Sequence, residues 1–335
     1  MSSLKAVRAS VLEEELINNI AAGTPVMIWG PPGVGKSDIV KQVATKLNRK
    51  HMDLRANLLD PTDLRGFPYI KNERACWAPP TFLPDPAREG EADAILNLEE
   101  VPAAPPSTQT ALYQLVLDYR IGEYYLPPNV AIIATGNQQG DRAATFSMPT
   151  PLKNRFAHYL LEVNLDDWLT WAFVNDVDHT ITAFMRFKPS NLHAFDPSVE
   201  AFPTPRSWAK LAKRLKHTNE GNLFTAASSL VGQGAGGEYV AFCKVYEFLP
   251  DLDQIEKDPK GTRLPKNDPA TLYAICGALS HRATRENVGA ILQYVGRMEP
   301  EFQVLFVKDA VKRTKKLMAT PEFNAWAQKN THIIL

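Results

Sequence analysis

The sequence has 335 residues, a length that suggests two domains, and 44% of its residues are hydrophobic, enough to form a buried core. Lys and Arg together number 37, as do Asp and Glu, so the formal net charge is zero. This composition excludes an intrinsically disordered chain, and zero charge argues against a dedicated nucleic-acid scaffold, which usually carries a basic excess.

Three widely spaced cysteines predict neither a disulfide framework nor a zinc site. The N-terminal residues carry charges where a signal peptide needs an apolar segment, and no apolar run reaches the length of a membrane span. We therefore expect a reduced, cytoplasmic protein with no membrane span.

The first pattern that indicates chemistry begins at residue 26. A short apolar run at 26–29 predicts a buried strand, and apolar residues recur at helical spacing from Ile39 to Leu47. Between them, residues 30–37 fit G-x-x-x-x-G-K-[ST], the phosphate-binding loop. The nine residues expected to hold ATP are Gly30, Pro31, Pro32, Gly33, Val34, Gly35, Lys36, Ser37 and Asp38.

The roles within this loop follow from its residue types. The glycines let backbone N–H groups converge on phosphate oxygens, and the N-terminus of the next helix faces the same anion. Lys36 would reach the β- and γ-phosphates, while the Ser37 hydroxyl would bind Mg²⁺. We therefore expect ATP and Mg²⁺ as cofactors.

A stretch at 59–86 is rich in Pro, Gly and aromatic residues, and it predicts a hairpin or an irregular insertion. Its large apolar side chains are expected to be exposed as an interaction surface; they are Leu64, Phe67, Tyr69 and Trp77. The alternative is that they pack on the core of their own subunit.

Two further apolar runs, at 94–98 and 130–134, predict buried strands of a parallel sheet. The first run ends in Glu99 and Glu100, and we expect it to lie beside the phosphate loop. Glu99 would then hold the Mg²⁺ shell, and Glu100 would orient or deprotonate the attacking water. Two solvated glutamates at a strand end are the alternative interpretation.

From about residue 166 onward, helical patterns replace the strands, for example at 208–215, 239–248 and 272–283. A Pro- and Asp-rich segment at 249–269 predicts a linker within this helical half. Residues 232–237 contain repeated glycines without a preceding strand, and they predict a flexible turn.

Together these motifs resemble the AAA+ ATPases, specifically the MoxR-like and dynein-related branch. Residues 135–137, after the third apolar run, are similar to sensor 1, with Asn137 as the γ-phosphate sensor. Residues 148–156 are similar to the family segment that carries the arginine finger, here Arg155, which acts on the site of a neighbouring subunit. Residues 204–208 resemble sensor 2, which implies that Arg206 reaches the nucleotide from a lid.

The resemblance implies an α/β P-loop NTPase fold. A three-layer core with a parallel sheet would span residues 1–163, and an all-helical lid with a C-terminal helical extension would span 164–335. In this family, the insertion near 59–86 and a hairpin near 119–127 project toward the pore of a ring. Glu99 stands where the family usually has Asp, so its carboxylate is displaced by about 1.5 Å, which still allows an outer-shell contact to Mg²⁺.

The resemblance also implies a function. An ATP hydrolase would assemble into a homo-oligomeric ring, most often a hexamer, and remodel or activate a protein client as a chaperone does. A von Willebrand factor A-domain protein is the expected partner. The alternatives are a DNA-associated motor of the restriction or helicase-loading type and a scaffold that hydrolyses ATP slowly. Zero net charge and the lack of a basic pore motif argue against nucleic acid as a partner.

Overall fold

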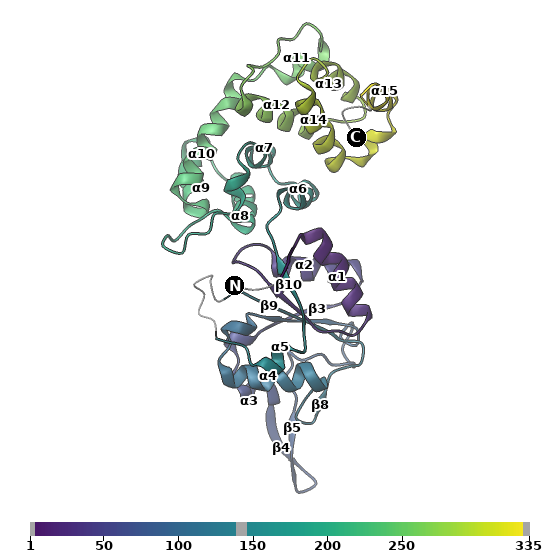
Figure 1. Ribbon diagram of the computed structural model, residues 1–335, viewed down its shortest axis with the longest axis vertical. Helices are drawn as coiled ribbons and strands as arrows, with labels where there is room; N and C mark the ends of the chain where they lie inside the picture. Colours follow the sequence, from purple (N-terminus) through teal and green to yellow (C-terminus); the bar gives the residue numbers. More distant parts are fainter. Residues whose placement is uncertain (1–3, 139–145, 331–335) are drawn as a thin grey trace. The chain divides into compact units, whose positions relative to one another are not determined.

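The computed structural model describes residues 4–138 and 146–330, and the chain divides into two compact units, Met1–Asn164 and Leu165–Leu335 (Figure 1). The first unit has an α/β fold, and the described part of the second unit is helical. An α/β core followed by a helical unit is the predicted fold class, which is thereby confirmed. None of the helices among the described residues is long and apolar enough to cross a membrane.

The first unit is built on one sheet of six strands, all of them parallel. In spatial order the strands are β1 (Ala6–Val7), β10 (Ala157–Leu161), β2 (Val26–Trp29), β9 (Ala131–Gly136), β6 (Ile95–Glu99) and β3 (His51–Arg55). The central strands are apolar on both sides because helices cover both faces of the sheet.

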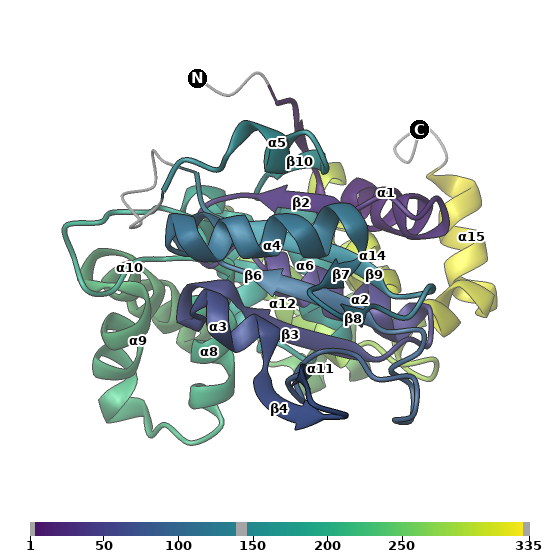
Figure 2. The ribbon, with the colours of Figure 1, turned by 90° about the horizontal axis from the view of Figure 1, so that it is seen from below.

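Three layers result from this arrangement (Figure 1). Helices α1 (Ala9–Ala21) and α2 (Lys36–Lys46) pack on one face, where Ile95 belongs to their hydrophobic cluster. The opposite face is covered by α3 (Pro61–Arg65), α4 (Pro106–Asp118) and α5 (Thr150–Lys153), and Leu96 and Leu98 point into that second cluster. Figure 2 shows α4 crossing in front of the sheet.

The strand that carries Glu99 is not adjacent in the sheet to the strand that precedes the phosphate loop. β9 lies between them, with Trp29 of β2 opposite Gly136 and Leu98 of β6 opposite Ala134. Two strand spacings of about 4.8 Å therefore separate the ends of β2 and β6. The carboxyl ends of parallel strands still meet at one edge, which keeps Glu99 on the same side of the sheet as the loop.

The insertion predicted at 59–86 contains a regular hairpin of β4 (Phe67–Lys71) and β5 (Arg74–Ala78). Its two turn residues, Asn72 and Glu73, have positive φ angles of 52° and 60°. A two-residue turn with positive φ at both positions matches the twist of the flanking strands. The hairpin is thus a regular ribbon rather than an irregular loop.

The apolar side chains of this insertion have different environments. Phe67 is 77% exposed and Tyr69 is 45% exposed, whereas Trp77 is half-buried. Leu64 is only 1% exposed and packs into the core beneath α3, so its predicted exposure was wrong. Leu64 belongs to a helix that packs on the sheet, while Phe67 and Tyr69 belong to a ribbon whose faces are uncovered.

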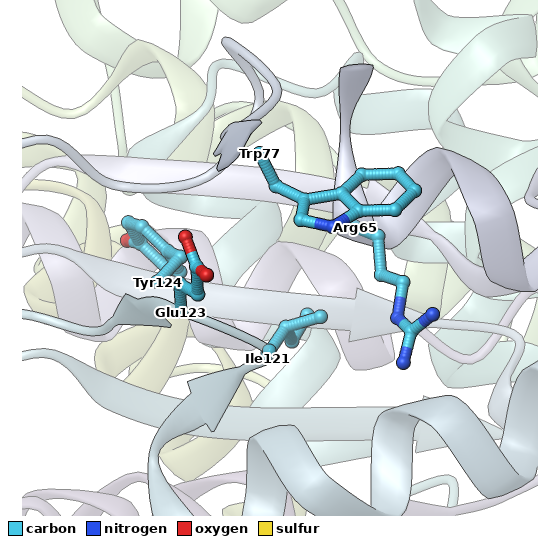
Figure 3. Close-up of a pocket in the computed structure, with 6 residues that line it drawn as sticks. Arg65, Trp77, Ile121, Glu123 and Tyr124 are labelled. Atoms are coloured by element: carbon cyan, nitrogen blue, oxygen red, sulfur yellow. The ribbon is translucent and has the colours of Figure 1, made fainter. Parts of the chain in front are cut away.

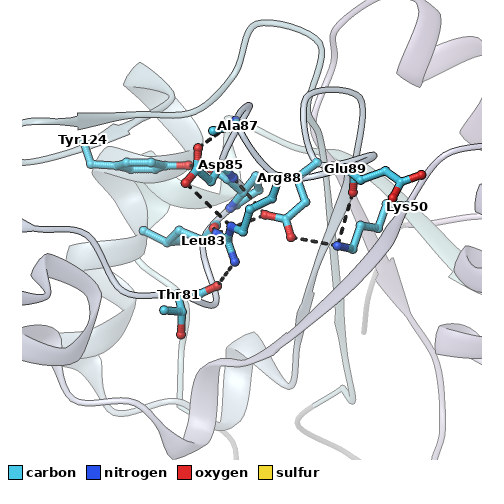
Figure 4. A network of polar contacts seen from close by, with 10 residues as sticks. Lys50, Thr81, Leu83, Asp85, Ala87, Arg88, Glu89 and Tyr124 are labelled. Atoms are coloured by element: carbon cyan, nitrogen blue, oxygen red, sulfur yellow. Dashed lines mark hydrogen bonds and ion pairs between the residues drawn. The ribbon is translucent and has the colours of Figure 1, made fainter.

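A second hairpin joins β7 (Arg120–Ile121) to β8 (Tyr124–Tyr125). The Tyr124 hydroxyl donates a hydrogen bond to the Pro84 carbonyl, and this bond attaches the hairpin to the segment that follows β5 (Figure 4). Burial, with a smaller contribution from Asp85, raises the pKa of Tyr124 to about 12, so the hydroxyl remains a donor at neutral pH.

That segment is held to the sheet by a buried carboxylate, Glu91, which is 3% exposed (Figure 4). Glu91 Oε1 accepts a hydrogen bond from Lys50 Nζ at 2.8 Å, and Oε2 accepts one from the Asp85 amide at 2.9 Å. Arg88 Nη2 lies 3.1 Å from the same Oε2 and also donates to the Leu83 carbonyl. Lys50 directly precedes β3, so the network anchors the segment to an edge strand of the sheet.

The second unit consists of helices in its described residues: α6 (Leu165–Val174), α7 (His179–Phe187), α8 (Pro205–Leu215), α9 (Leu223–Val231), α10 (Gln233–Cys243), α11 (Leu252–Lys257), α12 (Pro269–Arg282), α13 (Val288–Val295), α14 (Pro300–Arg313) and α15 (Pro321–Lys329). Aromatic rings fill part of its interior, where Phe184, Trp208 and Tyr239 have centroids 5.6 to 5.7 Å apart.

Two predictions for the second unit were wrong. The glycine-rich residues 232–237 form the start of α10 rather than a turn, because Gly236 lets the helix approach α9 closely. A Cβ on Gly236 would lie 2.8 Å from the Ser228 nitrogen. The predicted linker at 249–269 contains α11, whose Ile255 is fully buried in the C-terminal cluster.

The Glu91 network leads to a prediction about stability. Glu91→Gln should lower the melting temperature by several degrees at neutral pH, because Lys50 and Arg88 lose a buried anionic partner. The matched control is Glu89→Gln, because the Glu89 side chain is exposed and only its carbonyl contacts Lys50. Equal melting of both variants and the wild type would show that the network adds no stability.

The same variant has a defined pH dependence. The hydrogen bond from Lys50 lowers the pKa of Glu91 and outweighs burial, which would raise it. The stabilisation is therefore complete above the usual carboxyl pKa of 4.5 and is lost as the pH falls through the lower pKa of the folded state. The difference in melting temperature between the wild type and Glu91→Gln should shrink as the pH falls through the pKa that Glu91 has in the folded state.

Candidate functional site

The predicted phosphate loop connects β2 to α2 at the carboxyl edge of the sheet. Gly33 and Gly35 have φ angles of 78° and 97°, a left-handed conformation that glycine adopts without steric cost. Gly35 caps α2, so the first-turn amides of the helix and its dipole favour an anion in front of the loop. Gly30 is buried at the end of β2, and Asp38 is exposed on the first turn of α2.

Lys36 is buried, with 7% exposure, and its ammonium group lies inside the loop. Nζ donates hydrogen bonds to the carbonyls of Gly30 at 2.8 Å and Pro31 at 3.1 Å, and to Asn137 Oδ1 at 2.8 Å. A buried ammonium needs such acceptors, because it loses its hydration. The charge of Lys36 is thus held where the phosphate loop and the end of β9 meet.

Asn137 immediately follows β9 and is 8% exposed. It reaches Lys36 because the register places Gly136 opposite Trp29, the residue before the loop. The structure thereby brings together two predicted site residues that are 101 positions apart.

The two predicted glutamates differ in their surroundings. Glu99 Oε1 accepts a hydrogen bond from Asn97 Nδ2 at 3.3 Å, and Oε2 lies 3.7 Å from Arg55 Nε. Glu100 has φ 57° and ψ 36°, and its carboxylate has no hydrogen bond or ion pair within residues 4–138 and 146–330. A left-handed conformation costs a glutamate about 1 kcal/mol or more, and such strain is common at functional sites.

The backbone after Glu100 is fixed by a close contact between the 3₁₀ turn Val101–Ala103 and β9. A Cβ on Gly136 would lie 2.3 Å from Pro102 Cδ and 2.5 Å from Pro102 Cγ, so no larger residue fits there. Both residues are buried. The segment that positions Glu100 therefore rests directly on the strand that positions Asn137.

Arg155 is exposed and lies two residues before β10, and its side chain has no partner among the described residues. Because Ala157 of β10 pairs with Val26 of β2, Arg155 lies at the amino edge of the sheet. Gly30 lies four residue steps beyond Val26, which places the phosphate loop roughly 13 Å farther along, at about 3.3 Å per step. Arg155 is therefore separated from the phosphate loop of its own chain.

Arg206 belongs to the second unit, where it is the second residue of α8 and is exposed. Thr204 caps this helix by accepting a hydrogen bond from the Ser207 amide at 3.0 Å, and the Ser207 hydroxyl accepts one from the Thr204 amide. The cap fixes the direction in which the first turn begins.

The residues present suit a magnesium ion that arrives with a nucleotide. Ser37, on the first turn of α2, and Glu99, at the same edge of the sheet, offer oxygen donors, which Mg²⁺ prefers. No group of three or more His, Cys, Asp or Glu side chains among the described residues forms a metal cage by itself. Two oxygen ligands together with phosphate oxygens and water are the usual arrangement for Mg²⁺.

A cavity of about 210 Å³ lies away from these residues, between the base of the β4–β5 hairpin and the turn of the β7–β8 hairpin (Figure 3). Arg65 stacks over the Trp77 ring, with its guanidinium carbon 5.6 Å from the ring centroid. Glu123 and Tyr124 line the other side, and Ile121 lies between the two groups. The cavity marks where the β4–β5 and β7–β8 hairpins adjoin.

The polar groups around Glu99 were not predicted from the sequence. Asp53 and Arg55 lie on β3, directly opposite Asn97 and Glu99 of β6. The signal in the sequence was Asn97, the one polar residue within the apolar run at 94–98. The identity of its partners required the pairing of the two strands.

Comparisons with known proteins agree with this geometry. Residues 25–156 match the family described as the AAA domain (dynein-related subfamily). Lon protease 1 from Syntrophotalea carbinolica is 29% identical over 187 residues, which cover 49% of this chain and only 22% of that protein.

Solved structures that match the chain include RuvB and NtrX. A mutant of RuvB from Thermotoga maritima has a TM-score of 0.42 at 16% identity, with 75% of this chain and 76% of that chain covered. NtrX from Brucella abortus in complex with ADP has a TM-score of 0.40 at 14% identity, with 98% and 68% covered.

The site geometry leads to a prediction about nucleotide binding. Lys36→Met keeps the length of the side chain and removes its charge, so it should lose about 1.5–3 kcal/mol of charge-assisted hydrogen bonding. We expect the Kd for ATP to rise roughly 10- to 100-fold, measured with a fluorescent nucleotide. Lys41→Met, on the exposed side of the same helix, is the matched control. An equal effect of both variants would contradict the assignment.

Proposed function

We propose that this chain, whose residues 25–156 belong to the dynein-related subfamily of AAA domains, is an ATPase that couples ATP hydrolysis in a homo-oligomeric ring to remodelling or activation of a protein client. The observation that carries the proposal is the hydrogen bond from Lys36 to Asn137. This bond joins Lys36, the proposed phosphate-binding cation, to Asn137, the proposed sensor, at the edge of the sheet where β6 ends in Glu99.

Each residue at this edge has a proposed role. The loop amides and Lys36 bind the phosphates, and Asn137 exchanges its contact with Lys36 for one with the γ-phosphate. Ser37 and Glu99 hold Mg²⁺, which neutralises phosphate charge when bound. Glu100 orients or deprotonates the attacking water, and its unpaired carboxylate supports this role.

Arg155 is proposed to complete the site of a neighbouring subunit. Its position at the amino edge, roughly 13 Å along the sheet from its own loop, supports action in trans. Its exposure and its lack of a partner among the described residues leave the guanidinium available to a phosphate. A finger of this kind requires adjacent subunits, and we propose a ring, a hexamer being the expected form.

Arg206 is proposed to act in cis from the helical unit. A cation on the first turn of a helix is unfavourable next to the positive end of the helix dipole. An anion placed between that helix terminus and the guanidinium would remove the conflict, and the γ-phosphate is the proposed anion.

The trans assignment predicts a complementation result. Arg155→Ala should lower turnover about 10³-fold while ATP affinity stays near that of the wild type, because the finger acts mainly in the transition state. Mixing Arg155→Ala with Glu100→Gln subunits should restore part of the activity, since some interfaces then pair an intact Glu100 with an intact Arg155. Mixed assemblies of both variants that remain inactive would contradict action in trans.

The β4–β5 hairpin is proposed to contact the client. Phe67 and Ile70 are 77% and 75% exposed, and a two-stranded ribbon is marginally stable alone in water. Its base adjoins β7–β8, and the segment after it is anchored at Lys50. Lys50 precedes β3, the strand whose other end carries Arg55 beside Glu99. The client surface and the Mg²⁺ site would thus both be connected to one strand.

The resemblance to MoxR-like proteins supports a von Willebrand factor A-domain protein as the partner, and we propose one here. The double variant Phe67→Ala with Tyr69→Ala tests the hairpin. Because both side chains are exposed, melting temperature and basal ATPase activity should stay within error of the wild type while stimulation of ATPase activity by the partner is lost.

Two controls complete this test. Leu64→Ala, which truncates the buried side chain of the adjacent helix α3, should lower stability by about 2–5 kcal/mol. A comparable loss of stability in the double variant would mean that Phe67 and Tyr69 pack on their own subunit. Stimulation of ATPase activity by DNA rather than by the partner protein would favour a DNA-associated motor.

A further inference from the structure

The middle of β6 contains a buried amide group. Asn97 is 0% exposed and lies between Leu96 and Leu98, which are also fully buried. Burying a polar side chain destabilises a protein unless the side chain is hydrogen-bonded. Nδ2 of Asn97 donates to Asp53 Oδ1 at 2.9 Å and to Glu99 Oε1 at 3.3 Å. One amide therefore bridges two carboxylates that belong to neighbouring strands.

The orientation of this amide follows from charge. Turning it over would bring Oδ1 against the two carboxylate oxygens of Asp53 and Glu99, which are acceptors only. In the observed orientation, Oδ1 is buried and has no hydrogen-bond donor among the described residues. Asn97 thus leaves its own acceptor unsatisfied while both carboxylates are bound by its NH₂ group.

These groups share one face of the sheet. Alternate residues of a strand point to the same side, so Asn97 and Glu99 project together. The register places Asp53 opposite Asn97 and Arg55 opposite Glu99. Ile95, two residues before Asn97, contacts the cluster of α1 and α2, so this is the face covered by the helix that begins with Lys36 and Ser37.

We infer that Asn97 is a positioning residue, whose amide fixes the carboxylate of Glu99 for Mg²⁺. The inference rests on the proposed role of Glu99. A glutamate has one more rotatable bond than an aspartate and therefore loses more conformational freedom when it must hold one orientation. The Asn97 hydrogen bond restricts that freedom before Mg²⁺ binds, as residues that contact metal ligands commonly do.

Arg55 provides a weaker second restraint. Its Nε lies 3.7 Å from Glu99 Oε2, but the side chain is 67% exposed, so water screens the interaction. The buried amide is the stronger of the two restraints, because it cannot exchange its partners for water.

The unsatisfied Oδ1 atom makes the inference testable. If the only role of Asn97 were to stabilise the fold, replacing it with leucine should lower the melting temperature. However, Asn97 Oδ1 is buried without a donor among the described residues, and leucine removes this unfavourable group. We therefore expect leucine to be tolerated or stabilising at this position. A positioning role therefore predicts that Asn97→Leu keeps or raises the melting temperature and weakens the response to Mg²⁺. A purely structural role predicts a lower melting temperature with an unchanged response to Mg²⁺.

The experiment measures binding of a fluorescent ATP analogue as a function of Mg²⁺ concentration, together with thermal melting. The full chain is compared with Asn97→Leu, Glu99→Gln and the double variant. We expect Asn97→Leu to raise the Mg²⁺ concentration for half-maximal binding about tenfold, with unchanged affinity in the absence of Mg²⁺. The double variant should match Glu99→Gln alone, because Asn97 acts through Glu99.

Two further variants complete the design. Asn129→Ala removes another Asn-to-Asp hydrogen bond of 2.8 Å, at an exposed position near the start of β9, and should leave the Mg²⁺ response unchanged. Asn97→Val repeats the test with a smaller side chain in case leucine prevents folding.

The outcomes separate the inference from the proposed function. If Glu99→Gln leaves the Mg²⁺ response unchanged, the proposed role of Glu99 is wrong and the inference falls with it. If Glu99→Gln shifts the response and Asn97→Leu does not, only the inference about Asn97 is overturned. An equal shift from Asn97→Leu in the wild-type and Glu99→Gln backgrounds would also overturn it.

Discussion

The hydrogen bond from Lys36 Nζ to Asn137 Oδ1 joins the phosphate loop to the strand that separates it from the two glutamates. A buried ammonium requires acceptors, and the nearest carbonyls of its own loop supply only part of what it needs. Asn137 supplies a third acceptor because β9 lies next to β2 and the pairing places Gly136 opposite Trp29. The order of the strands therefore determines which side chains can share the site.

The sequence predicted the fold class and the three apolar strands, because their side chains are buried on both faces of the sheet. It did not predict β3, in which His51, Asp53 and Arg55 alternate with apolar residues at the edge of the sheet. It did not predict the order of the strands either, since apolar runs carry no information about which strands pair. The glycine-rich first part of the helix at 233–243 was missed because glycine favours turns locally, whereas close packing on α9 favours a helix there.

For the site, prediction was most informative where the residues are contiguous. The phosphate loop and the pair Glu99 and Glu100 could be identified from short motifs, because each motif is a continuous stretch of chain. The contact of Asn97 with Asp53 depends on a register between strands 44 residues apart in sequence, which no local pattern encodes. The left-handed backbone of Glu100 was equally hidden, since glutamate rarely adopts it.

The contact of Gly136 with Pro102 has a consequence for how this protein can diverge. No side chain fits at Gly136 while Pro102 stays in place, so a substitution of Gly136 alone disturbs the backbone beside Asn137 and Glu100. Homologues that keep Pro102 are therefore expected to keep Gly136, and a larger residue at 136 is expected only where residue 102 also differs. Correlated substitution at these two positions among homologues would show that the packing of the two residues against each other, rather than contact with ATP, restricts their replacement.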